Sequence, residues 1–142
     1  MPGSDPTHWL HRLDAAEWLA AAATELDQAH AALERRATRV GVTHARRAAG
    51  MAWNAVLVVA PTSGPTSTDR YGRSYMEHVV ALAQADDAGD GIPDDVRAAA
   101  RLLRDTPPRP PELVTIGKPD MAPLIAARAI ADYASRYVSE NG

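Results

Sequence analysis

One arginine and one histidine have the most specific spacing for chemistry in the sequence. Four residues separate Arg73 from His78. In one continuous helix these positions would point about 140° apart and could not act together. Ser74 and Glu77, however, match a capping box with Ser74 at the N-cap. Arg73 then stands just before the helix and His78 at its fourth position, and residues at those two positions meet in the hydrophobic-staple geometry. The spacing therefore predicts a guanidinium close to an imidazole.

The start of this predicted helix has the composition of a phosphate site. Free backbone amides and the helix dipole attract anions at a helix N-terminus. Arg70 and the Ser74 hydroxyl stand beside that terminus. The loop before it carries further hydroxyls at Thr66, Ser67 and Thr68. In this hypothesis Arg73 holds a phosphate and His78 moves a proton. The alternative is that His78 hydrogen-bonds inside the fold while Arg73 is a solvated surface residue.

Asn54 and Arg47 are two further candidates for ligand binding. Asn54 is the lone polar residue inside an apolar run and must find a partner if it is buried, either across a helix interface or at a site. Arg47 belongs to a basic cluster that also contains Arg35, Arg36, Arg39 and Arg46. That cluster could contact nucleic acid or simply be a solvated helix end, and it should lie at the opposite end of the second helix from Arg73.

Metal and cofactor chemistry have little support in the sequence. His8 and His11 have the i, i+3 spacing that can hold one metal ion on a helix face, but no third ligand is fixed. His30 lies beside the apolar stripe of the first helix and is expected to be a satisfied core or boundary residue. The sequence shows no glycine-rich phosphate loop and no serine-hydrolase elbow. We therefore predict neither a metal site nor a cofactor.

Composition limits the remaining function classes. The chain has 142 residues, 46% of them hydrophobic and 23% charged, which predicts a single globular domain over 1–142. The absence of cysteine excludes disulfides, thiolate zinc sites and a cysteine nucleophile, and fits a cytoplasmic protein. A net charge of -3 argues against nucleic-acid binding by the molecule as a whole. The N-terminus lacks the features of a signal peptide and the longest apolar run is too short for a membrane span.

Alanine-rich periodic segments must position these residues. With 29 alanines the chain favours helices over strands. We predict a first helix from about Asp5 to Arg39, ended by Gly41, either continuous or with a kink or a separate first turn near Asp14. A second helix is predicted from after Thr43 to before Pro61. The later helices are expected at about 74–85, 93–104 and 118–138, with a polyproline spacer over 107–111. The predicted fold class is all-α, an antiparallel up-down four-helix bundle with an extra short helix or a broken third helix.

Four of these segments, in this order, resemble the helices of small HEPN domains. They are EWLAAAATELDQA, ARRAAGMAWNAVLV, YMEHVVALA and AARAIADYASRYV, and the resemblance covers about 14–139. It implies an antiparallel helical bundle, usually a homodimer, that binds nucleotides or RNA. Many HEPN ribonucleases carry an arginine, four to six residues and a histidine, and Arg73 and His78 match that spacing. In those enzymes two copies meet across the dimer and cut RNA without a metal. Small members commonly act beside a minimal nucleotidyltransferase.

Three functions are therefore predicted. The leading one is a HEPN-like nucleotide- or RNA-binding module, with a minimal nucleotidyltransferase as a partner. The second is a metal-independent endoribonuclease that uses Arg73 and His78 across a dimer cleft. The third is a non-catalytic dimeric helical scaffold. In each case we expect a cytoplasmic homodimer that does not associate with membranes.

Overall fold

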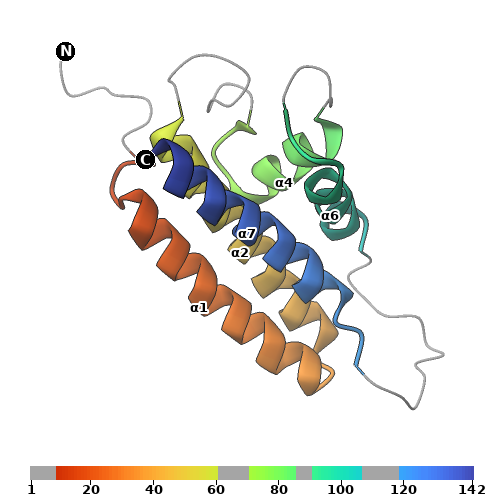
Figure 1. The fold of residues 1–142 in the computed structure, drawn as a ribbon. Helices are drawn as coiled ribbons and strands as arrows, with labels where there is room; N and C mark the ends of the chain where they lie inside the picture. The colour runs from red at the N-terminus through yellow and green to blue at the C-terminus, as the bar shows by residue number, and fades with distance from the viewer. Residues whose placement is uncertain (1–8, 61–70, 86–90, 107–118) are drawn as a thin grey trace.

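Helices make up the regular structure of the described part of the chain. The computed structural model describes residues 9–60, 71–85, 91–106 and 119–142. The helices in these ranges are α1 (Ala15–Glu34), α2 (Thr38–Val59), α4 (Tyr75–Gln84), α6 (Asp94–Asp105) and α7 (Ala122–Asn141). No strand occurs in them (Figure 1). The predicted all-α bundle is confirmed, and the segment from 74 to 104 is divided into two helices.

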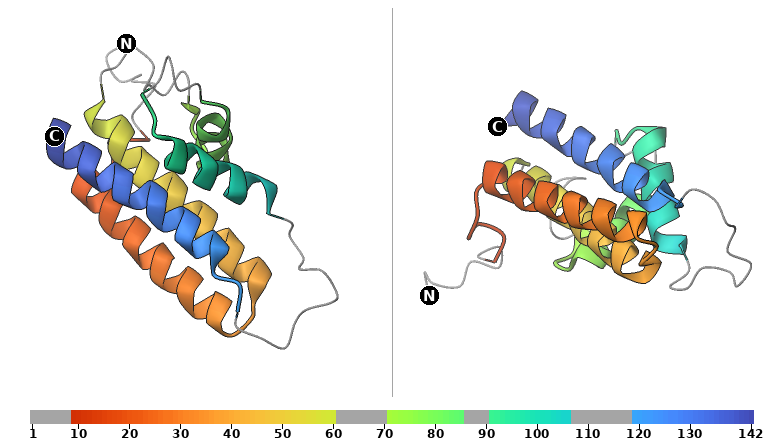
Figure 2. Two further views of the ribbon diagram at one scale, coloured as in Figure 1. Left: turned by 45° about the vertical axis from the view of Figure 1, so that its right-hand side comes forward. Right: turned by 90° about the horizontal axis from the view of Figure 1, so that it is seen from below.

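Three long helices and one short pair build the bundle. Figure 2 shows α1, α2 and α7 as long neighbours, with α4 and α6 packed together at one side of them. A three-residue connection makes α1 and α2 an antiparallel hairpin. The C-terminal ends of α2 and α7 meet, because Gly142 packs against Val59. α2 and α7 therefore run in the same direction, and α4 rests against α2 while α6 contacts α7.

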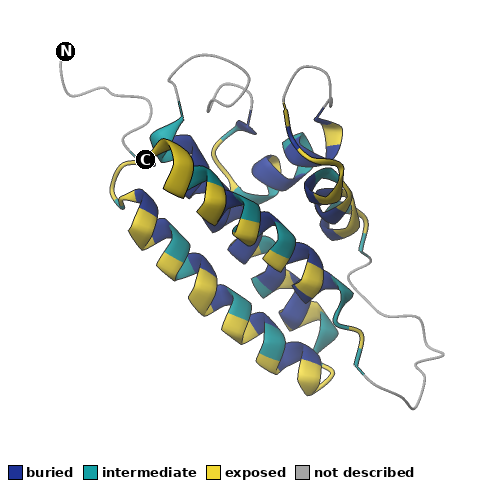
Figure 3. Cartoon of the chain, in the orientation of Figure 1, coloured by how far each residue is buried: buried dark blue, intermediate teal, exposed yellow. Residues whose placement is uncertain are grey.

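α2 is the central helix of the core. It contacts α1, α7, α4 and α6, and its residues from 48 to 57 are all buried (Figure 3). The apolar run of α2 is therefore a buried helix. Small side chains let the neighbours approach closely, and Gly50 is the clearest case. A Cβ at that position would collide with Tyr75, where α4 begins against α2.

The first helix begins later than the sequence predicted. A continuous helix from Asp5 is not formed, whereas the alternative of a break near Asp14 agrees with the structure. α1 starts at Ala15 behind a capping box formed by Asp14 and Glu17. The side chain of Asp14 accepts from the Glu17 amide at 2.8 Å, and the Glu17 carboxylate accepts from the Asp14 amide at 2.9 Å. Both hydrogen bonds of this cap join residues three apart in the sequence. They form without any helix before Asp14.

The turn between α1 and α2 also differs from the prediction. α1 ends at Glu34 and α2 starts at Thr38, so Gly41 lies inside a helix and is not a stop. Gly41 is buried, and a Cβ there would lie 2.5 Å from Leu33 Cδ2, so the missing side chain serves close packing. The chain reverses instead through Arg36, whose φ of 64° is left-handed.

The remaining boundaries agree more closely with the prediction. Ser74 caps α4, and Pro93 precedes α6, which ends one residue beyond Arg104. α7 begins at Ala122, slightly later than expected, and continues to Asn141. The predicted loop over 61–70 and the polyproline spacer lie outside the described residues. Within the described ranges, no helix is both long enough and apolar enough to cross a membrane.

Candidate functional site

His78 is a fully buried histidine between two helices and a loop. Its side chain has no solvent exposure. Nδ1 lies 2.7 Å from the Tyr71 carbonyl oxygen, and Nε2 lies 2.7 Å from Asn54 Oδ1. Asn54 thereby makes an inter-helix contact, one of the two roles expected of a lone polar residue in α2. The network ties α4 and the segment before it to the central helix.

The burial of His78 favours a neutral ring. Desolvation by burial lowers the pKa of His78, and the Tyr71 carbonyl, which favours a protonated Nδ1, opposes this more weakly. A neutral ring that donates from Nδ1 needs a donor at Nε2. Asn54 Nδ2 is buried and has no partner among the described residues, so a half-turn of this amide supplies that donor. His78 is then satisfied on both sides, and neither nitrogen is free for a substrate.

Trp9 lies against both Arg73 and His78. The Arg73 guanidinium carbon is 5.2 Å from the centroid of the Trp9 ring, a cation–π contact. The Trp9 ring stacks on His78 with centroids 6.4 Å apart and an interplanar angle of 26°. Arg73 is exposed, and in the described part of the chain no carboxylate pairs with it. The two residues that the sequence singled out thus share an aromatic neighbour, which sequence spacing gave no reason to expect.

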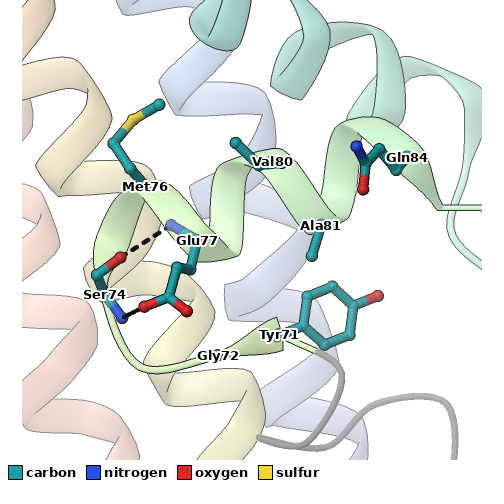
Figure 4. Close-up of a pocket in the computed structure, with 8 residues that line it drawn as sticks. All are labelled: Tyr71, Gly72, Ser74, Met76, Glu77, Val80, Ala81 and Gln84. Carbon is teal, nitrogen blue, oxygen red and sulfur yellow. Dashed lines mark hydrogen bonds between the residues drawn. The ribbon is translucent and has the colours of Figure 1, made fainter.

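The N-terminus of α4 is already capped by its own side chains. The Ser74 hydroxyl accepts from the Glu77 amide, and the Glu77 carboxylate accepts from the Ser74 amide, both at 3.0 Å (Figure 4). The Ser74 amide, and after it the Ser74 side chain, lower the pKa of the Glu77 carboxyl group. A carboxylate therefore occupies the position that we predicted for a phosphate. Ser74 serves as the cap, and Arg70 lies outside the described residues.

An open depression adjoins this helix start. It has a volume of about 430 Å³, within the range of small-ligand sites. Its lining, drawn in Figure 4, is Tyr71, Gly72, Ser74, Met76, Glu77, Val80, Ala81 and Gln84. The walls are mostly apolar, and Glu77 provides hydrogen-bond acceptors. The depression suits a flat or weakly polar group that donates hydrogen bonds better than it suits an anion.

Arg47 belongs to a different cluster, on the seam between α1 and α2. Its Nε donates to Glu25 Oε1 at 2.7 Å, and His44 Nδ1 lies 3.2 Å from the same oxygen. Glu25 is only 9% exposed although the sequence placed it off the apolar stripe. We call Glu25, His44 and Arg47 the Glu25 cluster. Sequence reasoning missed Glu25 and His44, because their partners come from separate helices.

Of the other arginines in the basic cluster, one caps the end of a helix and three lie at the surface. Arg46 donates from Nε to the Leu103 carbonyl at 2.8 Å and from Nη2 to the Thr106 carbonyl at 3.0 Å. It therefore caps the C-terminal end of α6, where carbonyls lack partners within their own helix. The remaining members are exposed: Arg35, Arg36 and Arg39.

The other histidines form no metal site in the described ranges. His30 is about half exposed and lies 3.6 Å from Glu34, four residues along α1. It is therefore a boundary residue. In the parts of the chain that the structure describes, no three His, Cys, Asp or Glu side chains are arranged to hold a metal ion. His8 lies outside those parts.

Comparisons with family models, curated proteins and solved structures find no match to this chain.

Proposed function

We propose that the chain is a HEPN-like nucleotide- or RNA-binding module whose ligand places a phosphate at Arg73. The observation that carries this proposal is the state of the Arg73 side chain, which is exposed, lies over Trp9 and has no carboxylate partner among the described residues. Stacking on an aromatic ring holds the planar guanidinium in place and leaves its N–H edge available. Such an edge matches the oxygens of a phosphate.

The depression beside Ser74 extends this binding mode. A phosphate at Arg73 would place the attached nucleoside near the start of α4, where the depression has room for a ring. Glu77 would accept hydrogen bonds from ribose hydroxyls or from an exocyclic amino group, since its pKa is lowered and it is ionised at neutral pH. The phosphate itself stays away from this carboxylate.

Binding is measured by fluorescence anisotropy with a short labelled single-stranded RNA, and by thermal shift with mononucleotides. We expect Arg73→Gln to weaken binding about tenfold, the usual effect of losing a hydrogen bond to a charged group. Arg128→Gln is the matched control, because it removes the same charge from an exposed position on α7. Equal losses in both variants would show that only net charge matters. Flat responses of the native protein to all nucleotides and RNAs would leave the dimeric scaffold as the remaining proposal.

The ribonuclease is the weaker proposal. Proton transfer to RNA requires an accessible ring nitrogen, whereas His78 is fully buried and both of its ring nitrogens are occupied by contacts with Tyr71 and Asn54. The experiment is incubation with RNA in the presence of a chelator, beside His78→Ala. Cleavage that disappears in the variant would favour this activity, and cleavage that persists unchanged would exclude His78 from it.

Two assembly proposals rest on the HEPN resemblance. One is a homodimer, which light scattering of the purified protein measures directly. The other is a minimal nucleotidyltransferase as partner, which co-purification of the two proteins expressed together would test. A monomer at all concentrations would contradict the first proposal without affecting phosphate binding at Arg73.

A further inference from the structure

The Glu25 cluster contains a histidine whose two ring nitrogens have different surroundings. Nδ1 of His44 faces Glu25 Oε1 at 3.2 Å, and a carboxylate oxygen can only accept, so the neutral ring carries its proton on Nδ1. Nε2 then presents a lone pair. It has no protein partner in the described parts of the chain, and the side chain is 27% exposed. A carboxylate placed in this way fixes the tautomer and the orientation of the ring.

Glu25 is itself held firmly. Its side chain is 12% exposed and lies between two helices, and Arg47 donates to the same oxygen at 2.7 Å. A buried carboxylate with two hydrogen-bond donors has little freedom to turn away from His44. The orientation of the imidazole is therefore set by the fold of the α1–α2 hairpin.

Arg47 supplies a cation near the His44 ring. Arg47 and His44 are three residues apart on α2, which places them on the same face of the helix. Their contact with a single oxygen keeps them within a few ångströms of each other. Glu25 engages Nε of Arg47, and the Arg47 side chain is 50% exposed, so its outer nitrogens remain available to an anion.

We propose that His44 is a phosphoryl acceptor, with Nε2 as the nucleophile, Glu25 as the residue that orients it and Arg47 as the cation that binds the transferred group. The donor is a small molecule with a phosphoryl group on a good leaving group, such as phosphoramidate. Nε2 attacks phosphorus, the N–P bond forms, and the P–N bond of the donor breaks. Ammonia leaves with that electron pair, and Nδ1 keeps its proton towards Glu25. This inference is independent of ligand binding at Arg73.

His30 is a matched control within the same molecule. It also lies near a carboxylate, Glu34, but there Nε2 is the nitrogen that faces the oxygen, at 3.6 Å. Its side chain is 45% exposed, more than that of His44. A reaction governed by accessibility alone would therefore favour His30. A reaction governed by the Glu25 cluster would favour His44.

The experiment is incubation of the full chain with phosphoramidate, followed by peptide mass spectrometry under alkaline conditions and by phosphorus NMR. We expect His44 to be modified before His30, at Nε2. Glu25→Gln should slow the modification of His44 about tenfold, because one hydrogen bond to a charged group is lost, and should leave His30 unchanged. Arg47→Gln should also slow it, with thermal melts to confirm that both variants are folded.

Two results would overturn the proposal. One is modification of His30 at the same rate as His44, or faster, in the native protein, a comparison that needs no variant. The other is an unchanged rate at His44 in folded Glu25→Gln. Either result would reduce the Glu25 cluster to an ion pair between two helices.

Discussion

The buried His78 makes the stability of this protein depend on pH in a defined direction. Burial lowers the pKa of His78 from its ordinary value of 6.5. At pH values near and below 6.5 the unfolded chain therefore binds more protons at His78 than the folded chain does. The folded state is thus favoured above pH 6.5 and loses stability as the pH falls.

The size of the effect follows from linkage. If His78 stays neutral in the folded protein, one proton is taken up on unfolding, and stability falls by about 1.4 kcal/mol between about pH 8 and about pH 5.5. The desolvation that comes with full burial disfavours the protonated ring in the folded state. Other titrating groups also change the free energy of unfolding with pH. The comparison must therefore be made with a variant that lacks only this ring.

Urea unfolding followed by circular dichroism, at both pH values, provides the measurement. His78→Gln lacks the titrating ring, and the loss of stability on acidification should be about 1.4 kcal/mol smaller in this variant than in the native protein. Equal losses in both proteins would refute the assignment of a neutral buried ring. A native protein that gained stability in acid relative to the variant would show that His78 is a buried imidazolium.

Asn54→Asp sharpens this test, because the substitution replaces the amide beside His78 Nε2 by a carboxylate of the same shape. A carboxylate at that position favours the protonated ring and raises its pKa. Relative to the native protein, Asn54→Asp should therefore become more stable as the pH falls through 6.5, the opposite sign. The same unfolding series measures it, and a parallel loss in both proteins would contradict the contact between Asn54 and His78.

Three stability predictions concern the packing of α4 and α6. Gly50→Ala should lower the free energy of unfolding by about 1–3 kcal/mol, because the new Cβ collides with Tyr75; an unchanged denaturation midpoint would contradict this close approach. Ser74→Ala should cost about 1 kcal/mol in the same assay, and Ser74→Asp should retain the cap. Arg46→Gln should cost about 1–2 kcal/mol, because two carbonyls at the end of α6 lose a charged donor; amide hydrogen exchange should then quicken in α6 before α1.

Local signals explain which boundaries the sequence could predict. The capping box at Ser74 involves residues three apart, so its geometry needs no tertiary contact, and the prediction is confirmed. Asp14 and Glu17 form the same pattern, which was available in the sequence and would have placed the start of α1 correctly.

Long-range contacts explain what the sequence could not predict. Gly41 resembles a helix stop, and only the position of Leu33 on the other helix shows that it serves packing. Glu25 has the sequence pattern of a solvated residue and is buried because donors from α2 reach it. The insertion of Trp9 beside His78 depends on a segment outside the helices, where hydrophobic periodicity carries no information.

The short connection between α1 and α2 has a consequence for how the chain reaches its folded state. Only three residues separate the two helices, so bringing them together costs little loop entropy. Contacts between residues that are close in the sequence form quickly. The contacts of α7 with α1 and α2 join residues far apart in the sequence and form more slowly. We therefore expect this hairpin to act as the folding nucleus, and the contacts of Glu25 with His44 and Arg47 to form before the burial of His78 beneath α4.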